Sequence, residues 1–228
     1  MTREDERSLE RTEMGKDPET TGSGLDISNT DLETIQDPEL DELIELLSQP
    51  TRALSRDERN ASIARRQEVF NKHLLSGGAD KLRRFFTVIK QRQQAQPVKL
   101  DLSMLEISGK LLTGLYLPGA NLEGLVITES DLTGSNLSGA NLKAVVGNGT
   151  IMRGVIATGA NFTDAVFPNA DFSGARLIGG TFVNTYLTDA IVDKDTNLVG
   201  ARFIGTFLGD TDLNITNHPG AIFRGIRR

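Results

Sequence analysis

The pattern of hydrophobic and polar positions changes near residue 100 of this 228-residue chain. Before that point, apolar residues recur at the spacing of amphipathic helices. After it, a leucine or phenylalanine recurs every five residues, a period that neither the 3.6-residue helix nor the two-residue strand produces. The first 37 residues follow neither pattern. The pattern therefore predicts three zones with different structures.

Residues 38–97 are predicted to form a helical N-terminal region that also caps the repeats. The first helix covers about residues 39–48 and ends before Pro50. The second begins after Ser55, where Glu58 has the spacing of a capping box, and stops at Gly77–Gly78. The third covers about residues 80–94. Its apolar face, which we expect to cap the N-terminal end of the repeats, consists of Leu82, Phe85, Phe86 and Ile89.

The five-residue period continues to the end of the chain. Its central position runs from Leu102 to Val192 in nineteen repeats, skips one residue within Asp193–Thr196, and resumes for six repeats from Leu198 to Phe223. In many repeats a small residue stands two positions before the central one, Asn or Asp stands directly before it, and glycine stands two after it. A fixed period of this kind is typical of a repeat architecture.

This pattern, complete in Ala120–Gly124, resembles the pentapeptide-repeat family, whose motif is a small residue, Asp or Asn, Leu or Phe, a polar residue and Gly. The resemblance implies a mainly β fold for residues 98–228: a right-handed quadrilateral β-helix, or pentapeptide-repeat solenoid, with four repeats to a coil. The central residue and the small residue two before it would point inward, and the other three would face solvent. Coils spaced like paired strands would give a rod of roughly 30 Å.

Three places depart from the motif. Gly147 and Ala157 occupy central positions, so we expect an underfilled core between Val145 and Ile156, or a chain that is locally shifted by one position. The extra residue within Asp193–Thr196 should bulge outward as a small loop. His218 at a central position should mark a distorted corner.

Charge divides the chain further. Residues 1–40 hold 12 acidic and 4 basic residues, and few large apolar ones, so residues 1–37 are predicted to be a disordered acidic tail. Residues 51–99 hold 12 basic and 4 acidic residues. Three interpretations of these basic helices remain open: a solvated outer face, contact with an acidic partner, nucleic acid or a membrane surface, or contact with the acidic tail.

No catalytic, cofactor-binding or metal-binding residue is expected, and the chain is not expected to be an enzyme. It has no cysteine, and its two histidines, His73 and His218, are far apart in sequence. No nucleophile–base pair or phosphate-binding loop stands out. Four aspartates near the insertion are interpreted as solvated corner carboxylates rather than a cation site: Asp193, Asp195, Asp210 and Asp212.

No run of roughly 18 apolar residues occurs, so no transmembrane segment is expected, and the charged N-terminus has no signal-peptide pattern. A cytoplasmic bacterial protein is the expectation, with a translocated effector as the alternative.

The resemblance implies a non-catalytic protein–protein interaction, scaffold or regulatory module built on a rigid rod, whose partner is another protein of unknown identity. A homodimer through an uncovered C-terminal coil is a further expectation, and direct binding to nucleic acid is not expected. One alternative is a DNA mimic that binds a type II topoisomerase (gyrase), although residues 100–228 hold 12 acidic against 9 basic residues, a weak imbalance for that role. The other alternative is a secreted bacterial effector.

Overall fold

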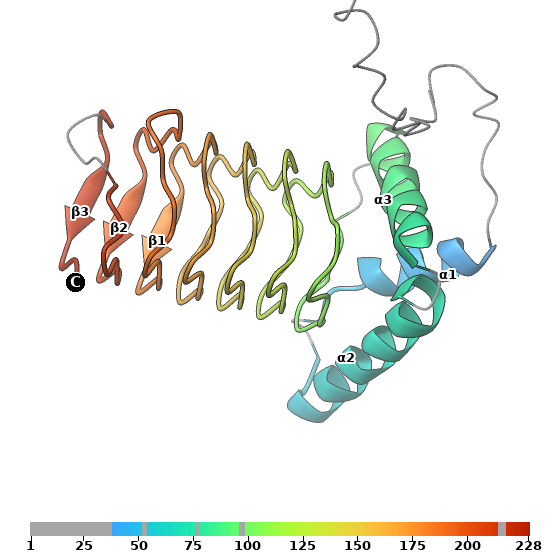
Figure 1. The fold of residues 1–228 in the computed structure, drawn as a ribbon. Coiled ribbons are helices and arrows are strands. Elements are labelled where there is room, and N and C mark those ends of the chain that lie inside the picture. Colours follow the sequence, from blue (N-terminus) through green and yellow to red (C-terminus); the bar gives the residue numbers. More distant parts are fainter. Residues whose placement is uncertain (1–37, 52–53, 76–77, 96–98, 214–217) are drawn as a thin grey trace, which may run out of the picture. The chain divides into compact units, whose positions relative to one another are not determined.

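The computed structural model describes residues 38–51, 54–75, 78–95, 99–213 and 218–228 (Figure 1). Contacts between Cα atoms divide the chain into residues 1–35 and residues 36–228, and every element described below belongs to the second unit. The predicted disordered tail, residues 1–37, lies outside the described residues.

The helical region contains α1 (Pro38–Ser48), α2 (Arg56–Phe70), a π-helical turn η1 (Asn71–Leu75) and α3 (Gly78–Ala95). The capping box at the start of α2 is confirmed: the Glu58 backbone N–H donates to Ser55 Oγ, and the Ser55 backbone N–H donates to the Glu58 carboxylate at 2.9 Å. The Ser55 hydroxyl also donates to the Glu58 carboxylate at 2.6 Å, and this bond, followed by the one from the Ser55 backbone N–H, lowers the pKa of Glu58. The third helix begins two residues earlier than predicted.

The apolar faces of the helices form a core of their own. Phe70 and Phe85 are fully buried, and their rings meet edge to face with centroids 6.5 Å apart. Phe85 also meets the Phe86 ring edge on at 5.0 Å. The α3 face predicted from the sequence is therefore buried, and the aromatic part of it packs with the end of α2.

Residues 99–213 and 218–228 form a β-helix whose coils stack one after another (Figure 1). Parallel bridges join residues 20 positions apart, such as Asp101 with Asn121, so four pentapeptides make one coil. Three columns of bridges persist along most of the coils as isolated pairs, and one widens into a short parallel sheet of β1 (Thr181–Val183), β2 (Arg202–Ile204) and β3 (Ile222–Arg224). The columns of bridges that define faces 1, 2, 3 and 4 begin at Asp101, Glu106, Leu111 and Tyr116.

The predicted inward positions are confirmed. Central residues from Leu102 to Leu187, and the small residues two positions before most of them, are buried. The register also confirms the inserted residue, because Asp171 pairs with Ile191 twenty positions later whereas Arg176 pairs with Asn197 twenty-one positions later. In the later coils the core contains a stack of parallel rings, with centroids 4.6, 4.5 and 5.0 Å apart, made by Phe162, Phe182, Phe203 and Phe223.

Hydroxyl groups at the small inward position are satisfied inside the core. Each donates to the carbonyl oxygen of a central residue in the preceding coil: Thr150 to Ile127 at 2.9 Å, Thr185 to Phe162 at 2.7 Å. Burial of an unpaired hydroxyl would cost about 1–3 kcal/mol, so these bonds let serine and threonine stand where alanine otherwise stands.

The predicted underfilling near Gly147 is wrong. A Cβ atom built on Gly147 would lie 2.3 and 2.6 Å from two ring carbons of Phe167, so that ring, one coil later in the same column, occupies the space. The predicted alternative of a shifted chain is also wrong. Val146 pairs with Val166 in the regular register, and Ala157 is fully buried at its central position.

The two ends of the β-helix differ. In the first coil, inward residues that an open end would expose are buried; Leu100 is 1 % and Leu105 0 % exposed, and the helices lie at this end (Figure 1). At the other end Phe223 is partly exposed, whereas Phe203, one coil earlier, is fully buried.

Candidate interaction surface

The first coil has no preceding coil to complete its backbone hydrogen bonds. In a later coil, the bridge residue uses both of its backbone groups: the Asn121 N–H donates to Leu100 O at 2.8 Å, and Asn121 O accepts from Leu102 N at 2.8 Å. Unpaired strand edges are costly when buried and invite unwanted pairing when exposed. Asp101 and Glu106 therefore need other partners.

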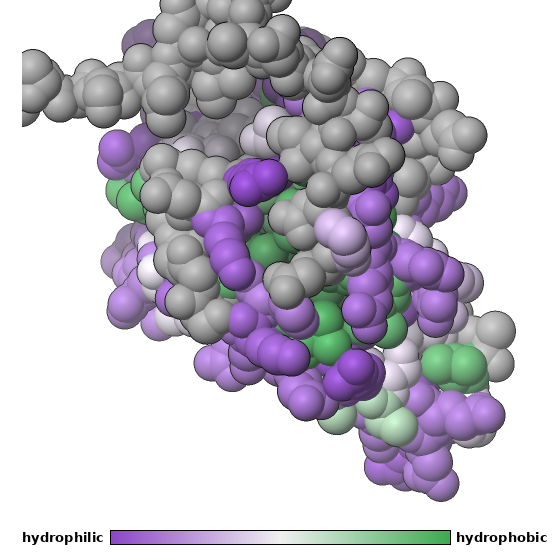
Figure 2. Space-filling view, turned by 90° about the vertical axis from the view of Figure 1, so that its right-hand side faces the viewer, coloured by the Kyte–Doolittle hydropathy of each residue, from purple (hydrophilic) through white to green (hydrophobic). Residues whose placement is uncertain are grey.

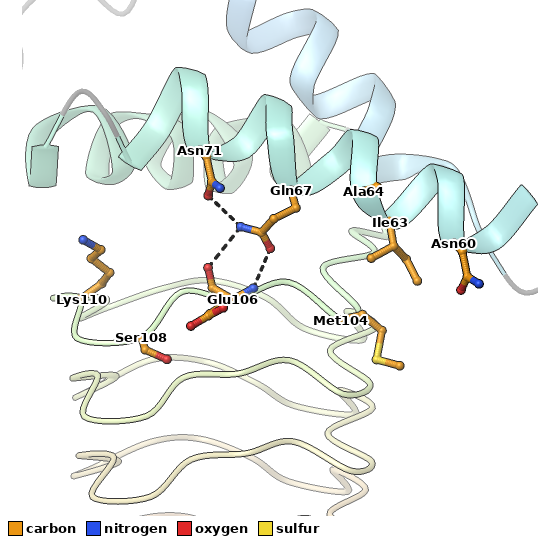
Figure 3. A pocket seen from close by; sticks show the side chains of 9 residues that line it. All are labelled: Asn60, Ile63, Ala64, Gln67, Asn71, Met104, Glu106, Ser108 and Lys110. Atoms are coloured by element: carbon orange, nitrogen blue, oxygen red, sulfur yellow. Dashed lines mark hydrogen bonds between the residues drawn. The ribbon is translucent and has the colours of Figure 1, made fainter. Parts of the chain in front are cut away.

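The helical region supplies these partners on faces 1 and 2. On face 1, the Asp101 N–H donates to Leu47 O at 2.6 Å, and Asp101 O accepts from Arg66 Nη1 at 3.1 Å. On face 2, the side-chain amide of Gln67 imitates a strand: its Oε1 accepts from Glu106 N at 2.7 Å and its Nε2 donates to Glu106 O at 3.3 Å (Figure 3). The sequence predicted a cap within residues 38–97, on the apolar face of the third helix, and did not predict these contacts.

Arg66 and Asp101 form a buried ion pair beneath this cap. Their side chains are 1 % and 6 % exposed, and Arg66 Nη1 lies 3.3 Å from Asp101 Oδ2. Thr51 donates to the same oxygen from its backbone N–H at 3.1 Å and its hydroxyl at 3.0 Å. Burial pushes the pKa of Asp101 upward, but hydrogen bonds from Ser103 and Thr51 and the Arg66 charge outweigh it and hold that pKa below its usual value. The carboxylate is thus held charged.

A ladder of asparagine amides leads away from Asp101 along face 1. Asn121 Nδ2 donates to Asp101 Oδ1 at 3.0 Å, Asn141 Nδ2 to Asn121 Oδ1 at 3.0 Å, and Asn161 Nδ2 to Asn141 Oδ1 at 3.5 Å. Every amide donates toward the capped end. The Asn or Asp that the motif requires before the central residue therefore links consecutive coils on this face.

A groove of about 630 Å³ lies between α2 and the first coil (Figure 3). A second hollow of about 490 Å³ shares Asn60, Ile63 and Met104 with the groove, and Arg56, Arg59 and Glu123 also line it. Met104 stands between the two with 55 % of its surface exposed and with φ of 61°, at a corner where the next coil has Gly124. The groove is lined by Asn60, Ile63, Ala64, Gln67, Asn71, Met104, Glu106, Ser108 and Lys110.

The surface of the helices is mainly hydrophilic, with hydrophobic surface showing in its middle (Figure 2). Some basic side chains have acidic partners within this region: Arg92 pairs with Asp41 of α1, and Arg65 with Glu68 at 3.4 Å. Further basic side chains on the helices are exposed: Arg56, Lys72, Lys81, Arg84 and Lys90. All three interpretations of the basic helices remain predictions.

The sequence candidates for metal chemistry do not come together. In the described part of the chain, no group of three His, Cys, Asp or Glu side chains is placed to hold a metal ion. His73 lies in η1 and His218 in the turn before β3, each half-buried.

The insertion loop is held by one of its own aspartates. Asp193 Oδ1 accepts from the Gly174 N–H at 2.9 Å and the Thr196 hydroxyl at 2.8 Å, and these bonds lower its pKa. Asp195 pairs with Lys194 at 3.0 Å, and Asp210 and Asp212 are exposed. The Asp193 carboxylate thus has a structural partner set rather than an open coordination site.

None of the helices in the described residues is long and apolar enough to cross a membrane.

Comparison with known proteins agrees with the repeat architecture. The family model for pentapeptide repeats matches eight copies, in residues 111–143 and 148–192. These residues are pentapeptide repeats, and the repeat supports the right-handed β-helix expected from the sequence. A search of curated proteins finds no match.

Solved structures similar to this chain are also pentapeptide-repeat proteins. HetL, involved in heterocyst differentiation regulation in the cyanobacterium Nostoc sp. strain PCC 7120, is 15% identical over 62% of this chain and 91% of HetL, with a TM-score of 0.31. Rfr23 from the cyanobacterium Cyanothece 51142 is 22% identical over 62% and 93%, with a TM-score of 0.26. Full-length QnrB1, a plasmid-mediated fluoroquinolone resistance protein, is 18% identical over 56% and 78%, with a TM-score of 0.29.

Proposed function

We propose that this chain is a non-catalytic protein-binding module in which the β-helix is a rigid support and the groove beside α2 is the recognition site. The observation that carries the proposal is Met104. It is a large apolar side chain that is mostly exposed and lies between two hollows. These hollows lie at the end of the β-helix to which a buried ion pair joins the helices. Its partner in this proposal is a loop or helix of another protein that presents apolar side chains.

The backbone at Met104 supports this role. A non-glycine residue with φ near 60° costs about 1–2 kcal/mol; of the equivalent corners in later coils, Gly124 avoids this cost, whereas Ala144 and Asp164 share it. A glycine at position 104 would remove that cost, so methionine there is unfavourable for folding alone. Methionine adapts its shape to irregular apolar partners, which suits a recognition surface.

The walls of the groove are held in place before a partner arrives. Gln67 joins α2 to Glu106 through two hydrogen bonds, and a third, from Gln67 Nε2 to Asn71 Oδ1 at 2.7 Å, fixes the orientation of that amide (Figure 3). A pre-formed surface loses less conformational entropy on binding, so less of the contact energy is spent on ordering.

The test is site-specific photo-cross-linking in native lysate, with a photoreactive residue at Met104 and, as a control, at Ser138 on face 4. We expect a defined cross-linked protein from position 104 and none from position 138. In a further variant the photoreactive residue is placed at the neighbouring Asn60. Adding Met104→Gly to it should leave the protein folded and remove most of the cross-linked product. Equal capture from both positions would contradict the proposal.

The gyrase-binding DNA mimic remains the alternative, and the charge distribution does not favour it. On face 2 the bridge residues from Val126 to Phe207, and the residues two places after them, are uncharged, and on face 3 the exposed Arg153 pairs with Asp171. A mimic of the DNA backbone needs a continuous line of carboxylates. We expect micromolar protein to leave gyrase supercoiling unchanged, and inhibition in that assay would revive the mimic. No observation favours the secreted effector.

A further inference from the structure

Face 2 of the β-helix differs from the other three faces in charge. Two of the three outward positions of a repeat are the bridge residue and the residue two places after it, and the third forms the corner of the coil. Charged residues occupy such positions on face 1 (Lys143), face 3 (Arg153) and face 4 (Arg176). On face 2, two adjoining columns are uncharged across five coils. The column of bridge residues consists of Val126, Val146, Val166, Tyr186 and Phe207. The column beside it consists of Thr128, Asn148, Pro168, Thr188 and Gly209.

The first of these columns is an apolar stripe with large and small residues at opposite ends. Val146 and Tyr186 are 38 % and 42 % exposed. The Tyr186 ring stacks on the Phe207 ring with centroids 4.2 Å apart, so the aromatic half of the stripe is rigid. Glu106 bounds the stripe at the capped end, and Arg227 bounds it at the other end. The guanidinium carbon of Arg227 lies 4.8 Å from the centre of the Phe207 ring.

This order of residues is complementary to itself when reversed. Counting along the bridges, Val166 has three bridge residues on either side. If a second copy lies antiparallel on the same face, with a two-fold axis at the level of Val166, Glu106 faces Arg227 of the partner and Arg227 faces the partner's Glu106. In the same arrangement Val126 faces the partner's Phe207, and Val146 faces the partner's Tyr186. Opposite charges thus meet at both ends of the stripe, and a large residue meets a small one at the four contacts between the ends and the axis, where Val166 meets its own copy.

We propose that face 2 binds the same face of a second copy of this chain, antiparallel, with Val166 at the two-fold axis. Such an interface is isologous, so each favourable contact occurs twice. The proposal shares Glu106 with the groove beside α2 but does not require a partner to bind there. It differs from the predicted homodimer through the C-terminal coil, because the rods would lie side by side rather than end to end.

The size of the face sets the expected strength. Six steps of about 4.8 Å give a stripe about 29 Å long. One side of a square coil is narrow, so the contact covers less than the roughly 800 Å² per partner of a typical stable interface. Acidic corner residues, among them Glu129 and Asp189, border the face and remain solvated at the rim. We therefore expect a weak dimer that forms at high protein concentration.

The experiment is sedimentation velocity of the full chain from about 10 µM to about 1 mM. Wild-type protein should pass from monomer to dimer in this range. Val166→Lys places two like charges at the axis and should keep the protein monomeric. Its matched control is Ile156→Lys, which replaces another β-branched apolar residue by lysine at the same repeat position on face 4 and should dimerise like the wild type.

The antiparallel register is tested by exchanging the charges at the two ends. Glu106→Arg and Arg227→Glu should each weaken dimerisation by about tenfold, because each creates two like-charge contacts in the dimer. The double variant Glu106→Arg/Arg227→Glu should restore it to within about threefold of wild type. The proposal is overturned if wild type stays monomeric at the highest concentration, if Val166→Lys dimerises normally, or if the double variant is weaker than either single one. Dimers that survive Val166→Lys but are lost on Phe223→Lys would show the end-to-end arrangement instead.

Discussion

Restoring the repeat motif at Gly147 should destabilise the protein. The motif asks for leucine at this central position, and a chain with an underfilled core would gain stability from it. In the structure, however, a Cβ atom at residue 147 would lie 2.3 Å from a Phe167 ring carbon and 2.8 Å from Thr150 Oγ1, far inside the 3.5–4.0 Å of favourable contact. Phe167 cannot move aside, because its fully buried ring packs edge to face on Phe162 and Phe172, 5.9 and 5.7 Å away.

The expected magnitude follows from overpacking, which costs about 1–3 kcal/mol in well-packed cores. Gly147→Ala should lose about 1–2 kcal/mol, since its smaller unfolded-state entropy offsets about 0.4–1 kcal/mol of the strain. Gly147→Leu should lose about 3 kcal/mol or more. Urea unfolding followed by far-ultraviolet circular dichroism measures both.

The control is Phe167→Ala, which alone should be destabilising because it removes a ring from the core and leaves a cavity. Combined with Gly147→Leu it should recover at least about 1 kcal/mol, because the leucine then occupies the vacated space. A higher urea midpoint for Gly147→Leu alone would refute this account and restore the interpretation of an underfilled core.

Three further predictions use the same unfolding measurement. Asp101→Ala leaves the buried Arg66 charge without its carboxylate and should cost about 3–5 kcal/mol, whereas Arg153→Ala, which removes a largely exposed partner of Asp171, should cost about 1 kcal/mol or less. Because the folded pKa of Asp101 is lowered, its charge stabilises the fold above its unfolded pKa of about 3.9, and that stability is lost as the pH falls through the folded pKa. Below about pH 4, the free energy of unfolding of the wild type should therefore fall more steeply than that of Asp101→Asn. In Gly139→Ala the added Cβ meets no atom within 4 Å, but the backbone φ is 65°, so the substitution should cost only about 1 kcal/mol. A loss as large as that of Gly147→Leu would contradict the assignment of this cost to the backbone alone.

The repeat was predictable from the sequence because a five-residue period leaves two inward positions in every repeat, and both are visible as residue types. The insertion near Asp193 was visible for the same reason, as a break in register. The pairing of Gly147 with Phe167 was missed because the motif was interpreted one repeat at a time. The two residues become neighbours only when positions 20 apart are compared, and a very small residue beside a very large one in that column is the available signal.

The cap was only half predictable. Amphipathic spacing and the capping box at Ser55 located the helices and their apolar faces, because those depend on local sequence. Arg66 and Gln67 gave no such signal, since a polar residue on a basic helix looks the same whether it faces solvent or completes a strand edge. Their roles depend on which backbone groups of the first coil lack a partner, and that is a property of the tertiary arrangement.

The one-way asparagine ladder has a consequence for how the chain is made. Every bridge in the β-helix joins residues 20 or 21 positions apart, and each ladder amide reaches back to a coil that precedes it in the chain. At a synthesis rate of about 5–20 residues per second, a ribosome delivers one coil every 1–4 seconds or so. Each new coil can then be templated on a finished one, and the helical cap, synthesised first, supplies the template for the first. At any moment during synthesis only the newest coil presents an open edge, so aggregation-prone backbone stays limited to a single moving front.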